Sequence, residues 1–493
     1  MSWTPLKGHL SGVHPAAAWG ILLAAAFWGT VPAPAAGAEP PAPAAISPRN
    51  EGASPDGNTR LEEMEEKIHQ LEEDLAALRR RETAPAGDVV LELQRRMEIL
   101  SREIEKLTIG EAADEAAGSV HGFGPAASKV YHKKQGVSIG GYGEMLFENP
   151  DARRDDGSPS GAVNAADLKR AVFYIGYRFS DHLLFNSELE FERGTTGKGG
   201  EASVEFAYLD FLFNEKINAR AGLLLMPMGF LNELHEPPVF LGAKRPELER
   251  RLIPTTWREN GAGVFGRLGQ VSYRAYLVTG FDGAGLKGEN DGFGAGGLRG
   301  GRQKGADALA EDLALVVRAD WQLAPGLTLG GAFYTGDSGQ GAVAPSTQET
   351  IQARTDILDL HAEWRWRGLE ARGLYVHVDL DDADLINDFQ GLSGSDSVGA
   401  EMNGHYLQVG YDVLSRLKTQ QALTPFVRHE EFDTQAEVPS GFLRDPARDV
   451  ELWTFGMSYK PIENVVLKLD FQNQDNRAGT GTDQWSLAIG WLF

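Results

Sequence analysis

From Gly136 to the end of the chain, apolar residues recur at every second position, and this alternation constrains the fold more than any other feature. The final segment, 483–493, carries five apolar residues on one face: Trp485, Leu487, Ile489, Trp491 and Phe493. A period of two over about ten residues indicates a β-strand with one apolar and one polar face. A soluble sandwich and a closed membrane barrel both produce this pattern, so the connections between the segments must distinguish them.

The connections between the alternating segments are short and long in turn. Short turns are expected at 180–182, 214–216, 269–270, 324–326, 367–368 and 461–463. Long polar connections cover 149–167, 227–259, 282–308, 337–352, 381–400 and 435–448. Turns at one end and long loops at the other are typical of an outer-membrane barrel. Aromatic residues at the ends of the apolar faces, such as Phe179, Trp321 and Trp366, match the interfacial girdles of such barrels.

The number of alternating segments, about sixteen, is an even number, as expected of a bacterial barrel. We therefore predict an all-β fold over residues 136–493: a transmembrane antiparallel β-barrel of about sixteen strands that encloses an aqueous channel. After Val31 no apolar stretch is long enough for a membrane helix, which excludes a helical transporter. The sequence has 0 cysteines, which excludes a disulfide scaffold and thiolate chemistry.

The chain ahead of Gly136 follows a different pattern. An apolar run ending at Val31 and the small residues Ala36-Gly37-Ala38 predict a secretory signal peptide over residues 1–38, with an uncleaved helical anchor as the alternative. Residues 39–57 are rich in proline and alanine and are predicted to be a linker.

Residues 58–109 carry apolar residues at alternating steps of three and four, with a break at 85–87. The first seam consists of Leu61, Met64, Ile68, Leu71, Leu75 and Leu78. This pattern predicts a short α-helical coiled coil in the periplasm, and its pieces are too short to be stable without partner helices. A lone solvated helix is the alternative. Residues 110–135 are small and polar and are predicted to be a second linker.

If the apolar face meets lipid, the opposite face of every strand lines the lumen. The basic residues predicted on that inner face are Arg170, Arg178, Arg220, Arg267, Arg274, Arg318, Arg372 and Arg428. Acidic residues share the face, among them Glu188, Glu190, Asp210, Asp359 and Asp470. Each charged residue has two interpretations: a salt bridge that supports the wall, or part of a field that sorts solutes by charge.

The connection at 227–260 is long, charged and interrupted by prolines, and a loop of this length in a closed barrel is usually functional. We expect it to fold into the lumen and narrow the channel, with an exterior cap loop as the alternative. Its basic residues are Lys244, Arg245, Arg250, Arg251 and Arg258. Fixed cations at a constriction raise the local concentration of anions. Glutamates accompany these cations, so the sign of the local field stays open.

Motifs for catalysis and cofactor binding are weak in this sequence. His235-Glu236 is followed by two prolines, which does not match a helical zinc motif. The acidic run 379–382 could bind Ca²⁺, but a solvated loop tip is the more typical interpretation. The formal net charge of −23 argues against nucleic-acid binding. We therefore predict that the protein is not an enzyme and has no cofactor, no metal and no nucleic-acid partner.

Several stretches resemble the phosphate-selective porin O and P family of outer-membrane channels. They are GGYGEMLFE (140–148), EFAYLDF (205–211), AGLLLMPMGFLNE (221–233), Lys244-Arg245-Pro246 and RENGAGVFG (258–266). The resemblance covers most of 136–493 and implies a homotrimer of sixteen-stranded barrels, each passing small anions. It also implies that the coiled coil is a periplasmic extension of the barrel. Phosphate-selective members line the pore with an arginine ladder and lysines, whereas here arginine alternates with acidic residues.

The resulting hypothesis is a porin of the bacterial outer membrane with its N-terminal segment in the periplasm. It forms a water-filled channel for passive diffusion of small hydrophilic solutes, with anions such as phosphate or organic acids favoured. Its expected partners are outer-membrane lipid, these solutes and two further copies of the chain. Two alternatives remain: a structural tether that joins the outer membrane to the periplasm through the coiled coil, and a barrel enzyme.

Overall fold

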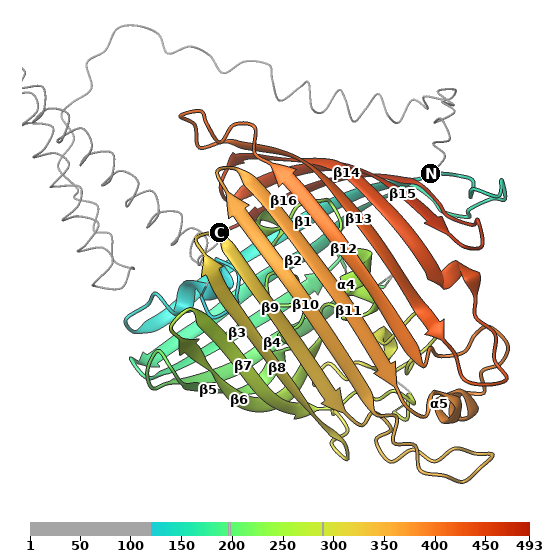
Figure 1. Ribbon diagram of the computed structural model, residues 1–493. Coiled ribbons are helices and arrows are strands. Elements are labelled where there is room, and N and C mark those ends of the chain that lie inside the picture. The colour runs from blue at the N-terminus through green and yellow to red at the C-terminus, as the bar shows by residue number, and fades with distance from the viewer. Residues whose placement is uncertain (1–119, 196, 198, 288–289) are drawn as a thin grey trace, which may run out of the picture. The chain divides into compact units, whose positions relative to one another are not determined.

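The computed structural model describes residues 120–493, apart from 196, 198 and 288–289 (Figure 1). The predicted signal peptide (1–38), first linker (39–57) and coiled coil (58–109) lie outside the described residues, as does the start of the predicted second linker.

The described residues form sixteen strands. Their bounds are β1 Gly136–Pro150, β2 Ala165–Ser180, β3 Leu183–Glu192, β4 Glu201–Leu212, β5 Asn218–Leu225, β6 Arg258–Leu268, β7 Val271–Thr279, β8 Leu313–Ala324, β9 Leu327–Gly336, β10 Thr355–Trp366, β11 Leu369–Leu380, β12 Glu401–Tyr411, β13 Ala422–Glu437, β14 Asp449–Ile462, β15 Val465–Asn476 and β16 Gln484–Leu492.

The helices are short and lie between the strands or ahead of β1. Their bounds are η1 Ala127–Val130, η2 Pro237–Val239, α4 Glu247–Arg251, η3 Arg299–Gly301, α5 Ala383–Gln390 and η4 Pro446–Arg448. None of the helices in the described residues has the length and apolar character needed to span a bilayer.

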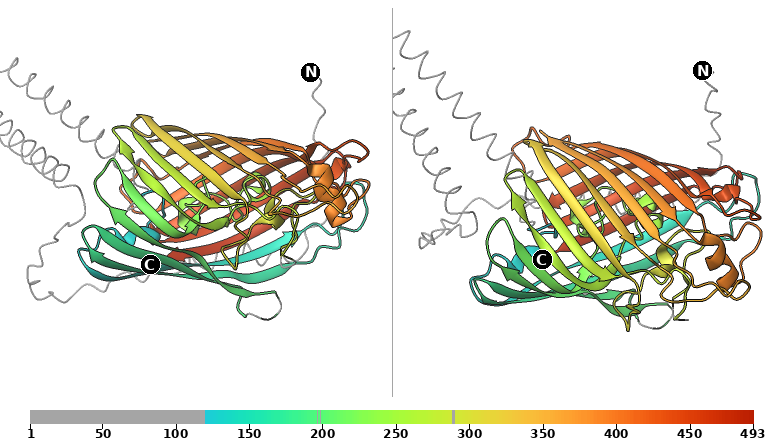
Figure 2. Two further views of the ribbon diagram at one scale, coloured as in Figure 1. Left: turned by 90° about the horizontal axis from the view of Figure 1, so that it is seen from below. Right: turned by 60° about the horizontal axis from the view of Figure 1, so that its bottom comes forward.

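The strands pair in chain order and close into one barrel. Each strand is antiparallel to its neighbours, and β1 pairs with β16 along a register that sets Tyr142 opposite Leu492 and Pro150 opposite Gln484. Figure 2 shows the tilted strands of this wall from two further sides. Closure leaves none of the sixteen described strands at the edge of an open sheet. The predicted antiparallel barrel of about sixteen strands is confirmed.

The two faces of the wall differ as the alternation predicted. On β2, Phe173, Ile175 and Tyr177 are exposed, whereas Val172 and Tyr174, which alternate with them, are buried. Large exposed aromatic residues lie next to the short turns, among them Phe179, Phe213, Trp321 and Trp366. The outer face is therefore apolar with an aromatic border, and the inner face is packed. We call the end of the barrel with the short turns the turn end and the opposite end the loop end.

The chain ahead of β1 differs from the expected linker, because residues 120–135 pack inside the barrel. Phe123, Ala126 and Val130 are buried, and η1 packs against β1, β2 and β3. The side-chain amide of Asn186 on β3 donates a hydrogen bond to the carbonyl oxygen of Ala127 at 2.9 Å. The small residues that resembled a linker allow this close packing: a Cβ on Gly124 would lie only 2.5 Å from the Glu236 carboxyl carbon.

The closing pair of strands provides a test of the wall. A Cβ on Gly141 of β1 would lie 2.3 Å from the backbone oxygen of Val172 and 2.7 Å from the Phe493 ring, whereas Gly373 on β11 has no atom nearer than 3.8 Å. We expect Gly141→Ala to lower the free energy of unfolding by about 1–3 kcal/mol through overpacking. Gly373→Ala should change it by less than about 0.5 kcal/mol. Resistance of the folded barrel to heating in SDS measures both, and equal effects would contradict the packing at Gly141.

Candidate functional site inside the barrel

The loop between β5 and β6, residues 226–257, lies in the lumen, as the sequence led us to expect. Its backbone N–H groups donate to carboxylates that point inward from three strands. Gly229 donates to Asp359 of β10 at 2.6 Å, and Ala243 donates to Asp470 of β15 at 2.6 Å. Leu248 donates to Glu430 of β13 at 3.0 Å. Because all three strands lie several strands away from β5 and β6, between which the loop is attached, the loop crosses the interior of the barrel.

Arginines of the wall hold carbonyl oxygens of the same loop. Arg318 of β8 donates to the carbonyl of Gly229 at 2.5 Å, and Arg372 of β11 donates to that of Val239 at 3.3 Å. A buried backbone group without a partner would destabilise the fold, so these contacts make the inward position of the loop tenable. Several inward charges predicted as filter elements therefore anchor the loop.

Two side chains within the loop fix its shape. Asn232 joins the loop's two ends: its amide accepts a hydrogen bond from the backbone N–H of Trp257 and donates to the carbonyls of Met226 and Trp257. Glu249 of α4 accepts from the backbone N–H groups of Phe230 and Leu231 and from the Tyr406 hydroxyl of β12. The loop is thus a folded element with its own hydrogen bonds.

The loop also holds the segment 120–135. The carboxylate of Glu236 accepts hydrogen bonds from the backbone N–H groups of Ala126 and Ala127, both at 3.0 Å. Burial raises the pKa of Glu236 to about 7. His121, at the start of the segment, lies against the rings of Tyr131 and Phe265 with part of its surface exposed; desolvation by the surrounding protein, together with the nearby charge of Arg220, lowers its pKa to about 4.

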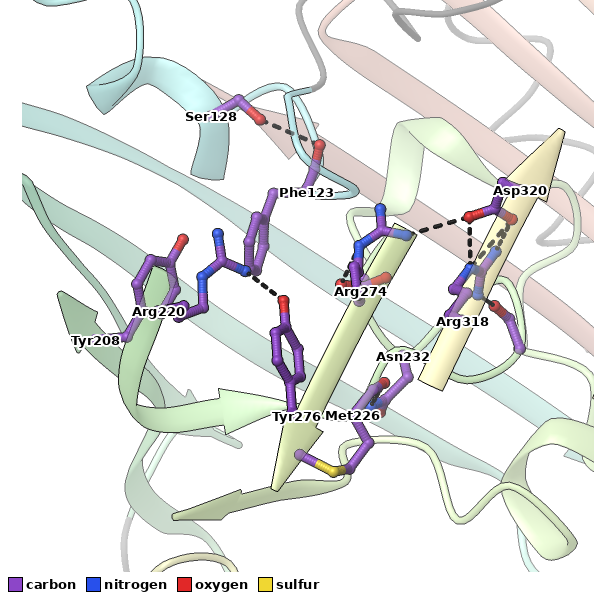
Figure 3. A network of polar contacts seen from close by, with 12 residues as sticks. Phe123, Ser128, Tyr208, Arg220, Met226, Asn232, Arg274, Tyr276, Arg318 and Asp320 are labelled. Carbon is purple, nitrogen blue, oxygen red and sulfur yellow. Dashed lines mark hydrogen bonds and ion pairs between the residues drawn. The ribbon is translucent and has the colours of Figure 1, made fainter. Parts of the chain in front are cut away.

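Arg220 of β5 anchors the same segment from the wall. Its guanidinium pairs with Asp210 at 2.7 Å and lies over the rings of Phe123 and Tyr208, at 4.8 and 4.1 Å from their centroids. The Tyr131 hydroxyl donates to Asp210 at 2.6 Å. Figure 3 shows Arg220 with Phe123 and Tyr208 on either side.

The predicted wall arginines point inward, and most pair with carboxylates. The pairs are Arg170 with Glu144 and Glu190, Arg220 with Asp210, Arg274 with Glu233 and Asp320, Arg318 with Asp320, Arg372 with Glu363, and Arg428 with Glu430. In Figure 3 the link from Arg274 through Asp320 to Arg318 crosses two neighbouring strands. The wall-supporting interpretation applies to these residues.

Two predicted arginines lie at the turn end. Arg178 donates to the carbonyls of Tyr131 and Ser180, and Arg267 donates to the carbonyl of Gly269. Both therefore stabilise turns or the inserted segment, and the structure does not bring them to the loop 226–257.

The predicted basic residues of the loop region divide into paired and unpaired groups. Lys244 pairs with Glu148 at 3.2 Å, and Arg258, the first residue of β6, pairs with Glu205 at 2.7 Å. Arg245 has one guanidinium nitrogen, Nη2, that is buried without a hydrogen-bond partner among the described residues. Burial and the nearby charge of Arg170 lower the pKa of Arg245.

Arg250 and Arg251 of α4 share one carboxylate, that of Glu247, and their side chains are 40% and 35% exposed. The Nη1 atoms of Arg251 and of Arg448 lie 3.4 and 3.7 Å from where a Cβ of Gly296 would be. Gly296 belongs to the loop 280–312 between β7 and β8, so three loops meet here.

Arg299 and Arg302 of the loop 280–312 complete this group. They donate to the carbonyl of Thr255, at 2.6 and 3.0 Å, and within the described part of the chain neither has a carboxylate in salt-bridge range. Burial, with neighbouring arginines, lowers the pKa of Arg299 to about 10 and that of Arg302 to about 9. Both stay protonated at pH 7.

We call Arg250, Arg251, Arg299, Arg302 and Arg448 the arginine cluster. Its five guanidinium groups have two carboxylate partners: Glu247, which pairs with Arg250 and Arg251, and Asp445, which pairs with Arg448 at 3.3 Å. The cluster is therefore a positive region where the loops meet, and it would attract small anions. Three of its members, Arg299, Arg302 and Arg448, lie in segments that the sequence analysis described only as long polar connections. A basic residue recurring in the glycine-rich stretch 292–304 was the available signal.

Known proteins resemble this chain in sequence and in fold. No family model matches the chain. An uncharacterized protein of Aquifex aeolicus (strain VF5) is 38% identical over 397 residues, which cover 79% of this chain and 87% of that protein. The chain belongs to the same family as this protein.

Among solved structures, the chain is similar to the anion-selective porin from Comamonas acidovorans, with 14% identity and a TM-score of 0.46 over 73% of this chain and 100% of that chain. It is also similar to the outer membrane channel DcaP of Acinetobacter baumannii, with 13% identity and a TM-score of 0.45 over 72% of this chain and 97% of that chain. Function has to be inferred from this chain's own geometry.

Glu236 and His121 predict opposite pH dependences for docking of residues 120–135. The pKa of Glu236 rises from 4.5 to about 7 on burial, so its contribution favours docking at low pH and is lost as the pH rises through 7. The pKa of His121 falls from 6.5 to about 4, so its contribution favours docking at high pH and is lost as the pH falls through 4.

In Glu236→Gln only His121 still titrates, and we expect docking of residues 120–135 to weaken as the pH falls below 6.5. In His121→Phe only Glu236 still titrates, and docking should weaken as the pH rises from about 4.5 to 7. Hydrogen exchange at 120–135, corrected for the intrinsic exchange rate at each pH, measures both. Identical profiles for the two variants would show that neither group is coupled to docking.

Proposed function

We propose that the protein is an outer-membrane porin, a passive channel for small hydrophilic solutes with a preference for anions. The observation that carries the proposal is the opposite character of the two faces of one closed wall. The outer face presents apolar side chains on strand after strand, such as Ile175, Leu315 and Leu469, which are 41%, 43% and 42% exposed. An apolar surface of this extent is unfavourable in water and favourable in a bilayer.

The orientation of the barrel supports a periplasmic location for the chain ahead of β1. Bacterial barrels place short turns in the periplasm and long loops outside. Strand β1 begins at the turn end, and residues 120–135 enter the barrel from there. The arginine cluster lies toward the loop end, in loops 226–257, 280–312 and 438–448. A solute from outside would meet the cluster before the segment 120–135.

The two inserted loops supply the proposed selectivity. The loop 226–257 narrows the lumen and sorts solutes by size, while the arginine cluster raises the local anion concentration. A guanidinium group matches the planar geometry of carboxylate and the oxygens of phosphate, so both fit as the favoured anions. The resemblance to phosphate-selective porins is consistent with this proposal. We also propose the homotrimeric assembly that this resemblance implies. We propose transport without catalysis, since the inward charges already serve the wall, the loops and this field.

Gly296 offers a direct test of the arginine cluster. A side chain there would point between the Nη1 atoms of Arg251 and Arg448, whose flexible ends can move aside. We expect Gly296→Glu to pair with these arginines and lower the anion-to-cation permeability ratio at least about twofold. Gly296→Gln, of the same size and without charge, should leave the ratio unchanged. Reversal potentials across a planar bilayer under a salt gradient measure the ratio. The same reversal potential in both variants would show that the arginine cluster does not determine the ion selectivity.

The lipid-facing role of the outer wall has its own test. Leu469 of β15 lies in the middle of the outer face, between Met457 and Leu487 of the adjacent strands. Arginine at the centre of a bilayer destabilises a barrel by about 2–4 kcal/mol, against about 0–1 near the interface. We expect Leu469→Arg to lower the free energy of unfolding in lipid vesicles by the larger amount. Asn473→Arg, four residues toward the loop end and opposite Trp453, should show the smaller amount. Equal values would argue against a membrane wall.

A further inference from the structure

Two adjacent strands carry a histidine and two glutamates whose donor atoms converge on the outer face of the barrel. They are His429 and Glu431 of β13 and Glu451 of β14. His429 Nε2 lies 3.1 Å from Glu451 Oε1 and 3.6 Å from Glu431 Oε1, and the three donor atoms lie within 4.8 Å of one another. These residues take no part in the contacts of the lumen, because their neighbours Arg428 and Glu430 point inward.

The spacing of these atoms matches the coordination sphere of a small divalent ion. Zinc binds imidazole nitrogen and carboxylate oxygen at about 2.0–2.2 Å in a tetrahedral arrangement, which separates neighbouring ligands by about 3.3 Å. The two distances from His429 Nε2, 3.1 and 3.6 Å, lie on either side of this value. Both carboxylates approach the same ring nitrogen, so one ion could contact all three donors with small side-chain rotations.

The pairing of the strands adds a reason for a cation at this place. Glu431 and Glu451 are directly opposite each other in the β13–β14 register. Like charges at opposed positions destabilise a sheet unless a cation lies between them. A positively charged ion held by both glutamates and His429 would remove the repulsion and join the two strands at the loop end of the wall.

The surroundings orient the donors. Trp453 Nε1 donates to Glu451 Oε1 at 3.1 Å, and its ring lies 4.3 Å from that of His429. Groups that hydrogen-bond to a metal ligand fix its direction and strengthen binding. The His405 ring of β12 lies 6.3 Å from the His429 ring, so a further imidazole borders the site.

A second histidine–carboxylate group on the same outer face has a different geometry. His377 contacts Asp379 through Nε2 at 3.2 Å and Glu401 through Nδ1 at 3.7 Å. The two carboxylates therefore lie against different nitrogens of one ring and do not share a centre. This group also combines one histidine with two carboxylates, here an aspartate and a glutamate, and it lacks the convergence of the first, which makes it a control.

We propose that His429, Glu431 and Glu451 form a binding site for a divalent first-row transition metal ion, with Zn²⁺ as the reference ion. One imidazole nitrogen and two carboxylate oxygens suit this class of ion. Three protein ligands leave one tetrahedral position open to water or to an anionic group of a neighbouring lipid. The site lies on the outer wall, beyond the exposed Phe455 and Met457 of β14 toward the loop end.

Calorimetric titration of Zn²⁺ into the purified full-length protein in detergent, after treatment with a chelator, tests the site. We expect one tight site per chain, with binding weakened at least about tenfold in His429→Gln and in Glu451→Gln because each removes one of three ligands. Trp453→Phe keeps the ligands and removes the orienting hydrogen bond, so it should weaken binding roughly tenfold. His377→Gln should bind as the wild type does.

Resistance to heating in SDS without added metal shows that each variant keeps its barrel, since all these side chains lie on the outer face. Equal weakening in His377→Gln, or unchanged binding in both His429→Gln and Glu451→Gln, would overturn the site. The titration does not depend on conductance, so its outcome is separate from that of the channel measurements. Zinc binding without conductance would support the metal site and contradict the proposed porin function.

Discussion

Backbone hydrogen bonds between β1 and β16 close the wall, and the interior of the protein depends on that closure. Gly141 and Phe493 exchange two such bonds, and the Phe493 ring lies over the space that a side chain at Gly141 would fill. A closed wall gives every strand one face toward a common interior. Charged side chains on that face are then removed from the outside and must find their partners within the barrel.

The interior meets this requirement by using a loop as the partner. The backbone of 226–257 supplies N–H groups to Asp359, Glu430 and Asp470, and carbonyl oxygens to Arg318 and Arg372. Wall and loop thus satisfy each other, since neither the inward charges nor the loop backbone could be buried alone. In the arginine cluster, where the loops approach one another, five guanidinium groups share only two carboxylate partners, Glu247 and Asp445. The proposed selectivity arises from the positive charge that remains after these structural contacts are made.

The wall could be predicted from the sequence because period-two alternation is a local property of each segment. It placed Arg170, Arg318 and Arg428 on the inner face, and in the structure they pair with Glu144, Asp320 and Glu430. The role of each inward charge could not be predicted, because it depends on the path of a loop far away in the chain. Arg318 illustrates this: its partners are a neighbour two residues away and a loop carbonyl 89 residues away.

Two other features could not be predicted from the sequence, for different reasons. Residues 120–135 have the small, polar composition of a linker, and their contacts with distant residues, such as Phe206, Tyr208 and Glu236, make them part of the interior. Arg299 and Arg448 lie in loops without periodicity, so no local pattern distinguished them from solvated charges. The zinc-ligand geometry likewise depends on the β13–β14 register, which sequence alone does not set.

Glu236 connects two parts of the interior that are distant in the chain. Its carboxylate holds the backbone of η1, while the loop that carries it is attached to β10, β13 and β15 and continues into α4. Traction on residues 120–135 would be borne by the wall through Asn186 and Arg178 and by the loop through Glu236. A pull on this segment would therefore reach α4, which carries Arg250 and Arg251, by way of the loop backbone.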